Sequence, residues 1–87
     1  MPRPRIEPSP HQPAADATRA ALVRAALGLF GRQGFDGTST RQIAAAAGAN
    51  IGSIAYHFGG KEGLRMAVAE HIVETVRAIT SRAVGDP

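Results

Sequence analysis

Hydrophobic side chains recur at helical spacing once the chain leaves its proline-rich start. From Thr18 onward the apolar positions fall every three or four residues, at Leu22, Ala25, Ala26, Leu29 and Phe30. That spacing places them on one face of an α-helix, with the arginines of the segment mostly on other faces. Asp16 or Thr18 can cap the start of this helix, and Gly34 can end it. Phe35-Asp36-Gly37 then predicts a tight connection.

A short helix follows this connection. Ser39 and Gln42 have the spacing of a capping box, in which each side chain accepts or approaches the backbone N–H of the other residue. The helix that the box opens is rich in alanine, and its pattern turns Ile43 and Ala47 inward. Gly48 is suited to end it.

Two further helices complete the pattern. Asn50 is a favourable N-cap for the third helix, which Gly59-Gly60 ends. The inward positions of the third helix are predicted to be Ile51, Ile54 and Phe58. The fourth helix runs from Lys61 to about Ala83 and carries an apolar stripe at Leu64, Val68, Ile72, Val76 and Ile79. This stripe is longer than a three-helix core needs, so we expect part of it to be exposed.

The spacing between the second and third helices is that of a helix-turn-helix. Two helices that cross closely need a small residue at the crossing, which Ala44 provides. Four residues later the turn needs a left-handed residue, and Gly48 adopts that conformation without a Cβ penalty. Six residues beyond, Ile54 can fill the space under the crossing. The three residues and the caps around them predict this motif, whereas an ordinary helical corner rarely meets every one of these demands.

The outward positions of the third helix are small or hydrogen-bonding, and none is acidic. They are Asn50, Gly52, Ser53, Ala55, Tyr56 and His57. Short side chains can approach the edges of bases in the major groove, and the absence of carboxylates avoids repulsion of phosphates. Lys61 at the start of the fourth helix, next to free backbone N–H groups, is suited to bind a phosphate.

Charge is concentrated in the segment that carries these helices. The formal net charge is +3, and residues 17–65 hold six Arg or Lys against two acidic residues. Such a positive field favours a polyanionic partner. Residues 1–16 contain five prolines, so we expect a disordered arm before a helical domain at 17–83. Arg3 and Arg5 could enter a minor groove, but we favour a plain leader or expression remnant.

Composition also bears on where the chain acts. It contains no cysteine, which fits a reducing cytoplasm. No apolar run approaches the length that crosses a bilayer, and no apolar segment follows the basic start as a secretory signal requires. We expect a soluble cytoplasmic protein without a membrane partner.

The residues do not predict an enzyme. His11, His57 and His71 lack the spacing of a metal site, and we expect His71 to be packed or half-buried on the fourth helix. Gly59-Gly60-Lys61 lacks the rest of a nucleotide-binding loop and is better explained as a helix end and start. Neither Ser39 nor Ser53 has a His and an acid nearby in a plausible arrangement, and each has a structural or DNA-contact explanation. We expect no cofactor and no metal.

The segment from Thr38 to Leu64 closely resembles the DNA-binding segment of the tetracycline-repressor (TetR) family of bacterial regulators. The matching features are a Gly-Phe step after the first helix, Ile-Ala-x-x-Ala-Gly, an aromatic run and a Lys-Glu-x-Leu opening, which stand here at Ala26–Phe35, Ile43–Gly48, Tyr56–Phe58 and Lys61–Leu64. The resemblance covers about residues 18–80. It implies an all-α, homeodomain-like fold, in which a three-helix bundle with the helix-turn-helix is followed by a fourth helix.

Roles at the DNA follow from this resemblance. It implies phosphate contacts from Thr38, Tyr56, His57 and Lys61, and a backbone contact from Arg41. Base-edge contacts would come from Gly52, Ser53 and Asn50. Many members carry Tyr or another large residue where this chain has Ala55. That departure removes one usual contact and shifts readout toward a thymine methyl or DNA shape.

The resemblance also sets expectations for the whole protein. Family members continue into a helical domain that binds a small-molecule inducer and forms a homodimer. That domain is absent from these 87 residues, so this segment alone is not expected to bind an inducer. The predicted function is sequence-specific repression at a palindromic operator in double-stranded DNA, by a dimer in the complete form. The alternative is a protein-interaction module that pairs through the fourth helix.

Overall fold

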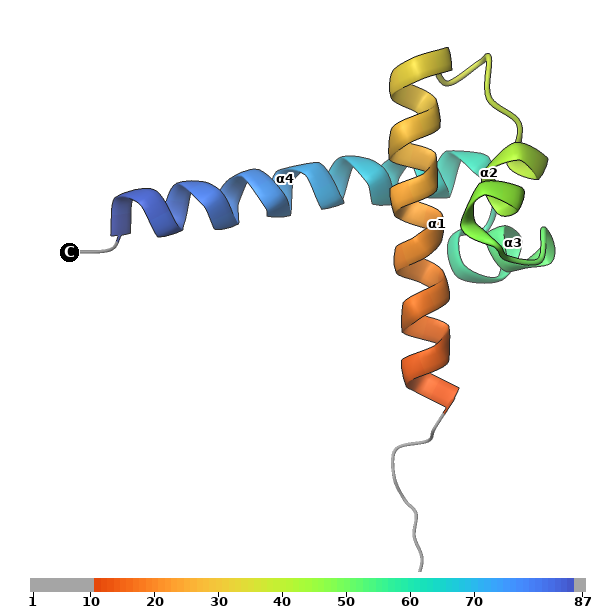
Figure 1. Cartoon of the computed structure of the whole chain (residues 1–87), viewed down its shortest axis with the longest axis horizontal. Coiled ribbons are helices and arrows are strands. Elements are labelled where there is room, and N and C mark those ends of the chain that lie inside the picture. The colour runs from red at the N-terminus through yellow and green to blue at the C-terminus, as the bar shows by residue number, and fades with distance from the viewer. Residues whose placement is uncertain (1–10, 86–87) are drawn as a thin grey trace, which may run out of the picture.

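The computed structural model describes residues 11–85, and the side chains of residues 14–82. Four helices make up this part of the chain: α1 (His11–Gln33), α2 (Thr40–Ala47), α3 (Gly52–Phe58) and α4 (Lys61–Gly85). It contains no strand, so the predicted all-α fold is confirmed. In Figure 1, α2 and α3 lie together beside α1, while α4 crosses α1 and projects away from the other helices.

The first helix begins earlier than the pattern predicts. It starts at His11, so Asp16 and Thr18 lie inside the helix and do not cap it. The density of prolines predicts an arm that extends to residue 16. Pro13 nevertheless lies in the first turn of α1, where its missing N–H would have no partner within the helix in any case. The alanines that follow it favour a helix. Residues 1–10 of the predicted arm, with Arg3 and Arg5, lie outside the described residues.

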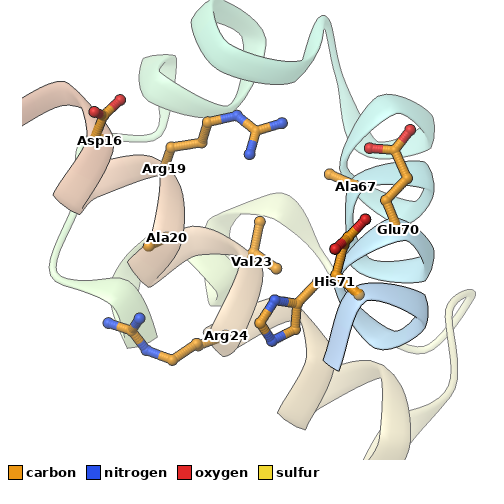
Figure 2. A pocket seen from close by; sticks show the side chains of 9 residues that line it. Asp16, Arg19, Ala20, Val23, Arg24, Ala67, Glu70 and His71 are labelled. Carbon is orange, nitrogen blue, oxygen red and sulfur yellow. The ribbon is translucent and has the colours of Figure 1, made fainter. Parts of the chain in front are cut away.

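Helices α1 and α4 cross in the middle of α1, and a groove runs beside the crossing. The groove has a volume of about 420 Å³ and is lined by side chains of both helices, among them Arg19, Val23, Glu70 and His71. Figure 2 shows that α1 contributes Asp16, Arg19 and Arg24 to its lining and that α4 contributes Glu70 and His71. His71 is exposed here, so the prediction of a packed histidine is wrong. From Ala69 onward α4 is exposed, and no other element covers it within residues 14–82.

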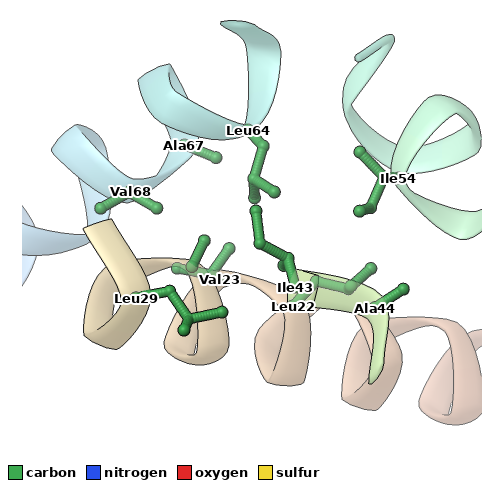
Figure 3. Close-up of a cluster of buried hydrophobic side chains, with 10 residues drawn as sticks. Leu22, Val23, Leu29, Ile43, Ala44, Ile54, Leu64, Ala67 and Val68 are labelled. Atoms are coloured by element: carbon green, nitrogen blue, oxygen red, sulfur yellow. The ribbon is translucent and has the colours of Figure 1, made fainter. Parts of the chain in front are cut away.

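The core lies where α1, α2, α3 and the first turns of α4 meet. Its buried side chains are Leu22, Val23, Ala26, Leu29, Ile43, Ala44, Ile54, Leu64, Ala67 and Val68. The predicted inward residues of the four helices are confirmed at most of these positions. Val23 and Ala67 were not predicted, because α1 packs against α4 as well as α2 and therefore buries a wider face than one stripe (Figure 3). Ala25, Ala47, Phe30 and Phe58 are only partly buried.

The connection between α1 and α2 is held by side chains of both helix ends. Thr38 N–H donates to Phe35 O at 3.2 Å, which closes the predicted turn. The capping box is confirmed: Gln42 N–H donates to Ser39 Oγ at 3.1 Å, and Ser39 N–H donates to Gln42 Oε1 at 2.9 Å. Gln33 Nε2 also donates to Gln42 Oε1 at 3.3 Å, so the end of α1 and the start of α2 share one acceptor.

The two ends of α4 have different surroundings. Leu64, Ala67 and Val68 are buried against the other helices, whereas Ile72, Val73, Val76 and Ile79 are 44–59% exposed. The expectation that part of the stripe is exposed is confirmed.

Within residues 11–85 there is no helix that combines the length and the hydropathy needed to span a membrane.

Candidate nucleic-acid interface

The corner between α2 and α3 has the geometry that the spacing predicts. Ala44 is 3% exposed and Ile54 is 2% exposed, so both lie under the crossing of the two helices. Gly48 has φ 67°, and Ala49 N–H donates to Ala44 O at 2.9 Å. A residue with a Cβ is strained at this φ. The buried alanine, the left-handed glycine and the buried isoleucine together fix α3 against α2.

This corner leaves one face of α3 on the surface. Asn50, Gly52, Ala55 and Tyr56 are exposed, and Tyr56 is 79% exposed; Ser53 and His57 are partly exposed. The prediction that Ile51 is inward is wrong, because its side chain is 44% exposed. Ile51 stands directly before Gly52, the first residue of α3. The outward face is therefore continuous from the turn to the end of α3.

Asn50 fixes the start of this face. The residue directly before α3 is Ile51, which has helical backbone angles and makes no side-chain cap. Asn50 Oδ1 instead accepts from Gly52 N–H at 2.8 Å, and Asn50 O accepts from Ser53 N–H at 2.9 Å. The predicted capping by Asn50 is thus one position further from the helix than expected. Its side-chain oxygen is occupied, while its amide group carries two further donors.

Aromatic contacts set the position of the end of α3. The rings of Tyr56 and His57 meet edge to face with centroids 4.9 Å apart, and those of His57 and Phe58 lie 5.9 Å apart. The Arg19 guanidinium of α1 lies 5.0 Å from the centroid of Phe58. These contacts anchor Phe58 to α1 and leave the hydroxyl end of Tyr56 at the surface.

The first turn of α4 continues the same surface. Its first helical hydrogen bond runs from Leu64 N–H to Gly60 O at 3.1 Å, so the preceding N–H groups have no acceptor within the helix. Lys61 is partly exposed there, with Nζ 4.3 Å from the centroid of the Phe35 ring. A Cβ at Gly63 would collide with the carbonyl oxygen of Phe58. The close approach at Gly63 therefore seats α4 directly on the end of α3.

The charged side chains of residues 41–61 are all basic. Residues 41–61 contain no Asp or Glu. The next residue, Glu62, is paired with Arg65, whose Nη2 lies 2.9 Å from Glu62 Oε1. Arg41 is exposed on α2. An anion that approaches α3 therefore meets cations and backbone N–H groups but no uncompensated carboxylate.

Thr38 lies apart from the other predicted contacts. Its side chain is 2% exposed, and its hydroxyl donates to Gly34 O at 2.8 Å. It also accepts from Gln33 Nε2 at 3.3 Å. The hydroxyl thus satisfies the C-terminal end of α1 in the interior, and its side chain is not presented to a ligand. The other predicted residues of α3 and the first residue of α4 are all at least partly exposed: Asn50, Gly52, Ser53, Ala55, Tyr56, His57 and Lys61.

Sequence reasoning did not find the aromatic partners of the cations. The sequence predicts a tight connection and a family-typical Gly-Phe step at Phe35, and a position off the apolar stripe for Arg19, but no cation partner for either. Their partners lie far away in the sequence, at Lys61 and Phe58, and no local spacing links them. No cluster of three or more His, Cys, Asp or Glu suited to a metal lies within the described part of the chain.

The segment that carries this surface is similar to known bacterial regulatory proteins. The family model of the bacterial regulatory proteins of the tetR family matches residues 22–68. The HTH-type transcriptional regulatory protein RaaS of Mycobacterium tuberculosis is 44% identical over 71 residues, which are 80% of this chain and 33% of that protein. The HTH-type transcriptional dual regulator CecR of Shigella flexneri is 44% identical over 61 residues, covering 70% of this chain and 27% of the relative.

A named repressor is also similar. The HTH-type transcriptional repressor NicS of Pseudomonas putida is 43% identical over 58 residues, which are 67% of this chain and 27% of that protein. The chain thus spans about a third or less of the length of these relatives. No solved structure matches it significantly.

Proposed function

The chain belongs to the TetR family of bacterial regulatory proteins, and we propose that its complete form represses transcription by binding a palindromic operator as a dimer. Its relatives are DNA-binding transcriptional regulators, and one is named a repressor. The observation that carries the proposal is the acid-free outward face of α3 behind the Ala44–Gly48–Ile54 corner. The regulator acts in the cytoplasm and is not an enzyme, and any inducer binds outside this segment.

In the proposed complex α3 lies in the major groove. Gly52 and Ser53 approach base edges closely because their side chains are short, and the free amide donors of Asn50 face an acceptor on a base or sugar. Ala55 presents a methyl group, which suits contact with a thymine methyl. Base readout by this face is sparse, so DNA shape contributes to the preference for a sequence.

The phosphate contacts flank this helix. Tyr56 and His57 reach the backbone from the end of α3, Arg41 from α2, and Lys61 from the start of α4. Thr38 makes no phosphate contact in this complex because its hydroxyl is buried and donates to Gly34 O of the α1 end. These contacts set the register of α3 without reading sequence themselves.

The salt dependence of DNA binding tests the phosphate assignment. We expect Lys61→Ala to weaken binding to every duplex and to reduce the slope of log affinity against log salt by about one unit. Arg77→Ala is the matched control, because Arg77 is an exposed cation on the far part of α4, paired at 3.6 Å with Glu74. Titrations of a fluorescent duplex at several salt concentrations measure both slopes. Equal slopes for the two variants would contradict the phosphate role of Lys61.

Selection of bound sites from random DNA tests the sequence readout. We expect recovered half-sites to be related by a two-fold axis and separated by roughly 10 base pairs or a multiple. Ser53→Ala should change the recovered bases, whereas Lys61→Ala should recover the same bases at lower yield. Recovery of no common sequence by the wild-type chain would contradict specific recognition.

A second candidate function rests on the exposed stripe of α4. Ile72, Val76 and Ile79 are each at least 44% exposed, and an apolar face of this kind marks an interaction surface. The chain would then be a module that pairs through α4. Sedimentation separates the candidates: a monomer that shifts palindromic DNA supports the regulator, and a tight dimer that ignores DNA supports the module.

A further inference from the structure

Two cationic side chains from the first turns of α4 contact the ring of Phe35. Lys61 Nζ lies 4.3 Å from its centroid, and the Arg65 guanidinium carbon lies 4.5 Å from it. Phe35 itself belongs to the connection between α1 and α2 and packs on Phe30, with centroids 5.2 Å apart. The two cations are one helical turn apart on α4. The face of an aromatic ring attracts cations at such distances.

From this arrangement we infer that Phe35 is a positioning residue for the phosphate contact of Lys61, and that it holds the ammonium group in place before DNA arrives. The inference rests on the proposed function. A free lysine samples many rotamers, and fixing them opposes binding. A lysine already held on a ring loses less freedom when a phosphate is bound.

The neighbouring charges determine which cation is left for the phosphate. Arg65 is paired with Glu62 at 2.9 Å. Within residues 14–82, Lys61 has no ion pair, and the ring of Phe35 is its only cation–π partner. Glu62 therefore offsets the charge of Arg65, and the charge of Lys61 stays available next to the free N–H groups of α4. The ring holds a cation without neutralising it, which a carboxylate could not do.

A simpler role for Phe35 is apolar packing on Phe30. The two roles predict different effects of removing the ring on DNA binding once Lys61 is replaced by an uncharged residue. Phe35→Leu keeps an apolar side chain but removes the aromatic face, and Phe35→Tyr keeps the face. Lys61→Met keeps a long apolar side chain but removes the charge. The four chains made from Phe35→Leu and Lys61→Met form a double-mutant cycle.

The experiment measures binding of each chain to a two-turn duplex of unrelated sequence across salt concentrations. We expect Phe35→Leu to weaken binding about threefold while the salt slope stays unchanged, because the phosphate contact still forms. In the Lys61→Met background Phe35→Leu should have no effect, and Phe35→Tyr should bind like the wild type. Equal effects of Phe35→Leu in both backgrounds would overturn the positioning role and leave the proposed function intact.

Two further outcomes are distinguishable. If Lys61→Met binds as tightly as the wild type, the phosphate assignment itself fails, and the positioning role with it. Proton NMR of the wild-type chain tests the contact without any variant: the ε-methylene protons of Lys61 should be shifted upfield by the ring. An unshifted signal would overturn the inference even if Phe35→Leu failed to fold.

Discussion

The two halves of α4 carry the same apolar periodicity but have opposite surroundings. Leu64 and Val68 are buried by α1, α2 and α3, whereas Ile72, Val76 and Ile79, further along the same stripe, are exposed. Periodicity therefore predicts that the segment is a helix and which face is apolar, but not whether another element covers that face. A stripe is buried only where another element packs on it, so of the two halves of α4 only the first should contribute to the stability of the domain.

The largest expected effect comes from emptying the buried half. Leu64 is fully buried, so Leu64→Ala should lower the free energy of unfolding by about 2–5 kcal/mol through lost burial and a cavity. Ile79→Ala is the matched control on the exposed half and should change it by about 0.5 kcal/mol or less. Urea titration followed by circular dichroism measures both. Similar losses at the two positions would show that the second half is also covered in solution.

A smaller effect is expected where α4 touches the end of α3. Gly63→Ala introduces a Cβ that collides with the Phe58 carbonyl oxygen, and relieving the overlap should cost about 1–3 kcal/mol. Gly31→Ala is the control, because a Cβ at this helical glycine of α1 meets nothing within 4 Å. It should be neutral or stabilising by up to about 1 kcal/mol. Thermal unfolding compares them, and an unaffected Gly63→Ala would mean that α4 is not seated on α3.

The smallest expected effect concerns a single cap. Ser39→Ala removes the acceptor of Gln42 N–H and should cost about 1 kcal/mol. Ser81→Ala, on the exposed half of α4, should have almost no effect. Denaturant midpoints of the two variants measure the difference. If Ser81→Ala lowered the free energy of unfolding as much as Ser39→Ala, Ser81 would have to make a stabilising contact in solution, although it is exposed in this structure.

Features encoded by neighbouring residues were predictable from the sequence. The capping box at Ser39 and Gln42 and the left-handed Gly48 are decided within a few residues, and the structure has them as expected. The same holds for the buried pair Ala44 and Ile54, whose spacing is set by one motif. Local chemistry therefore fixed the corner that presents α3.

Features that depend on distant segments were missed or wrongly predicted. Val23 is buried because α4 crosses α1 there, and the pattern of α1 alone does not show where that crossing falls. Ile51 is exposed although it is apolar, and its place directly before α3 gives no local signal of that exposure. The position of Phe35 beneath Lys61 depends on how the α1–α2 connection folds back on α4. Each of these needs the relative placement of two helices.

Tyr56 has a practical consequence beyond its place on α3. The chain holds one tyrosine and no tryptophan, and that tyrosine is 79% exposed on the outward face of α3. The three phenylalanines absorb at shorter wavelengths than tyrosine, so emission excited beyond their absorption band originates from a single ring at the surface proposed to meet DNA. The molecule carries its own optical probe at this position, and contact of that surface with another molecule can be followed without attaching a dye.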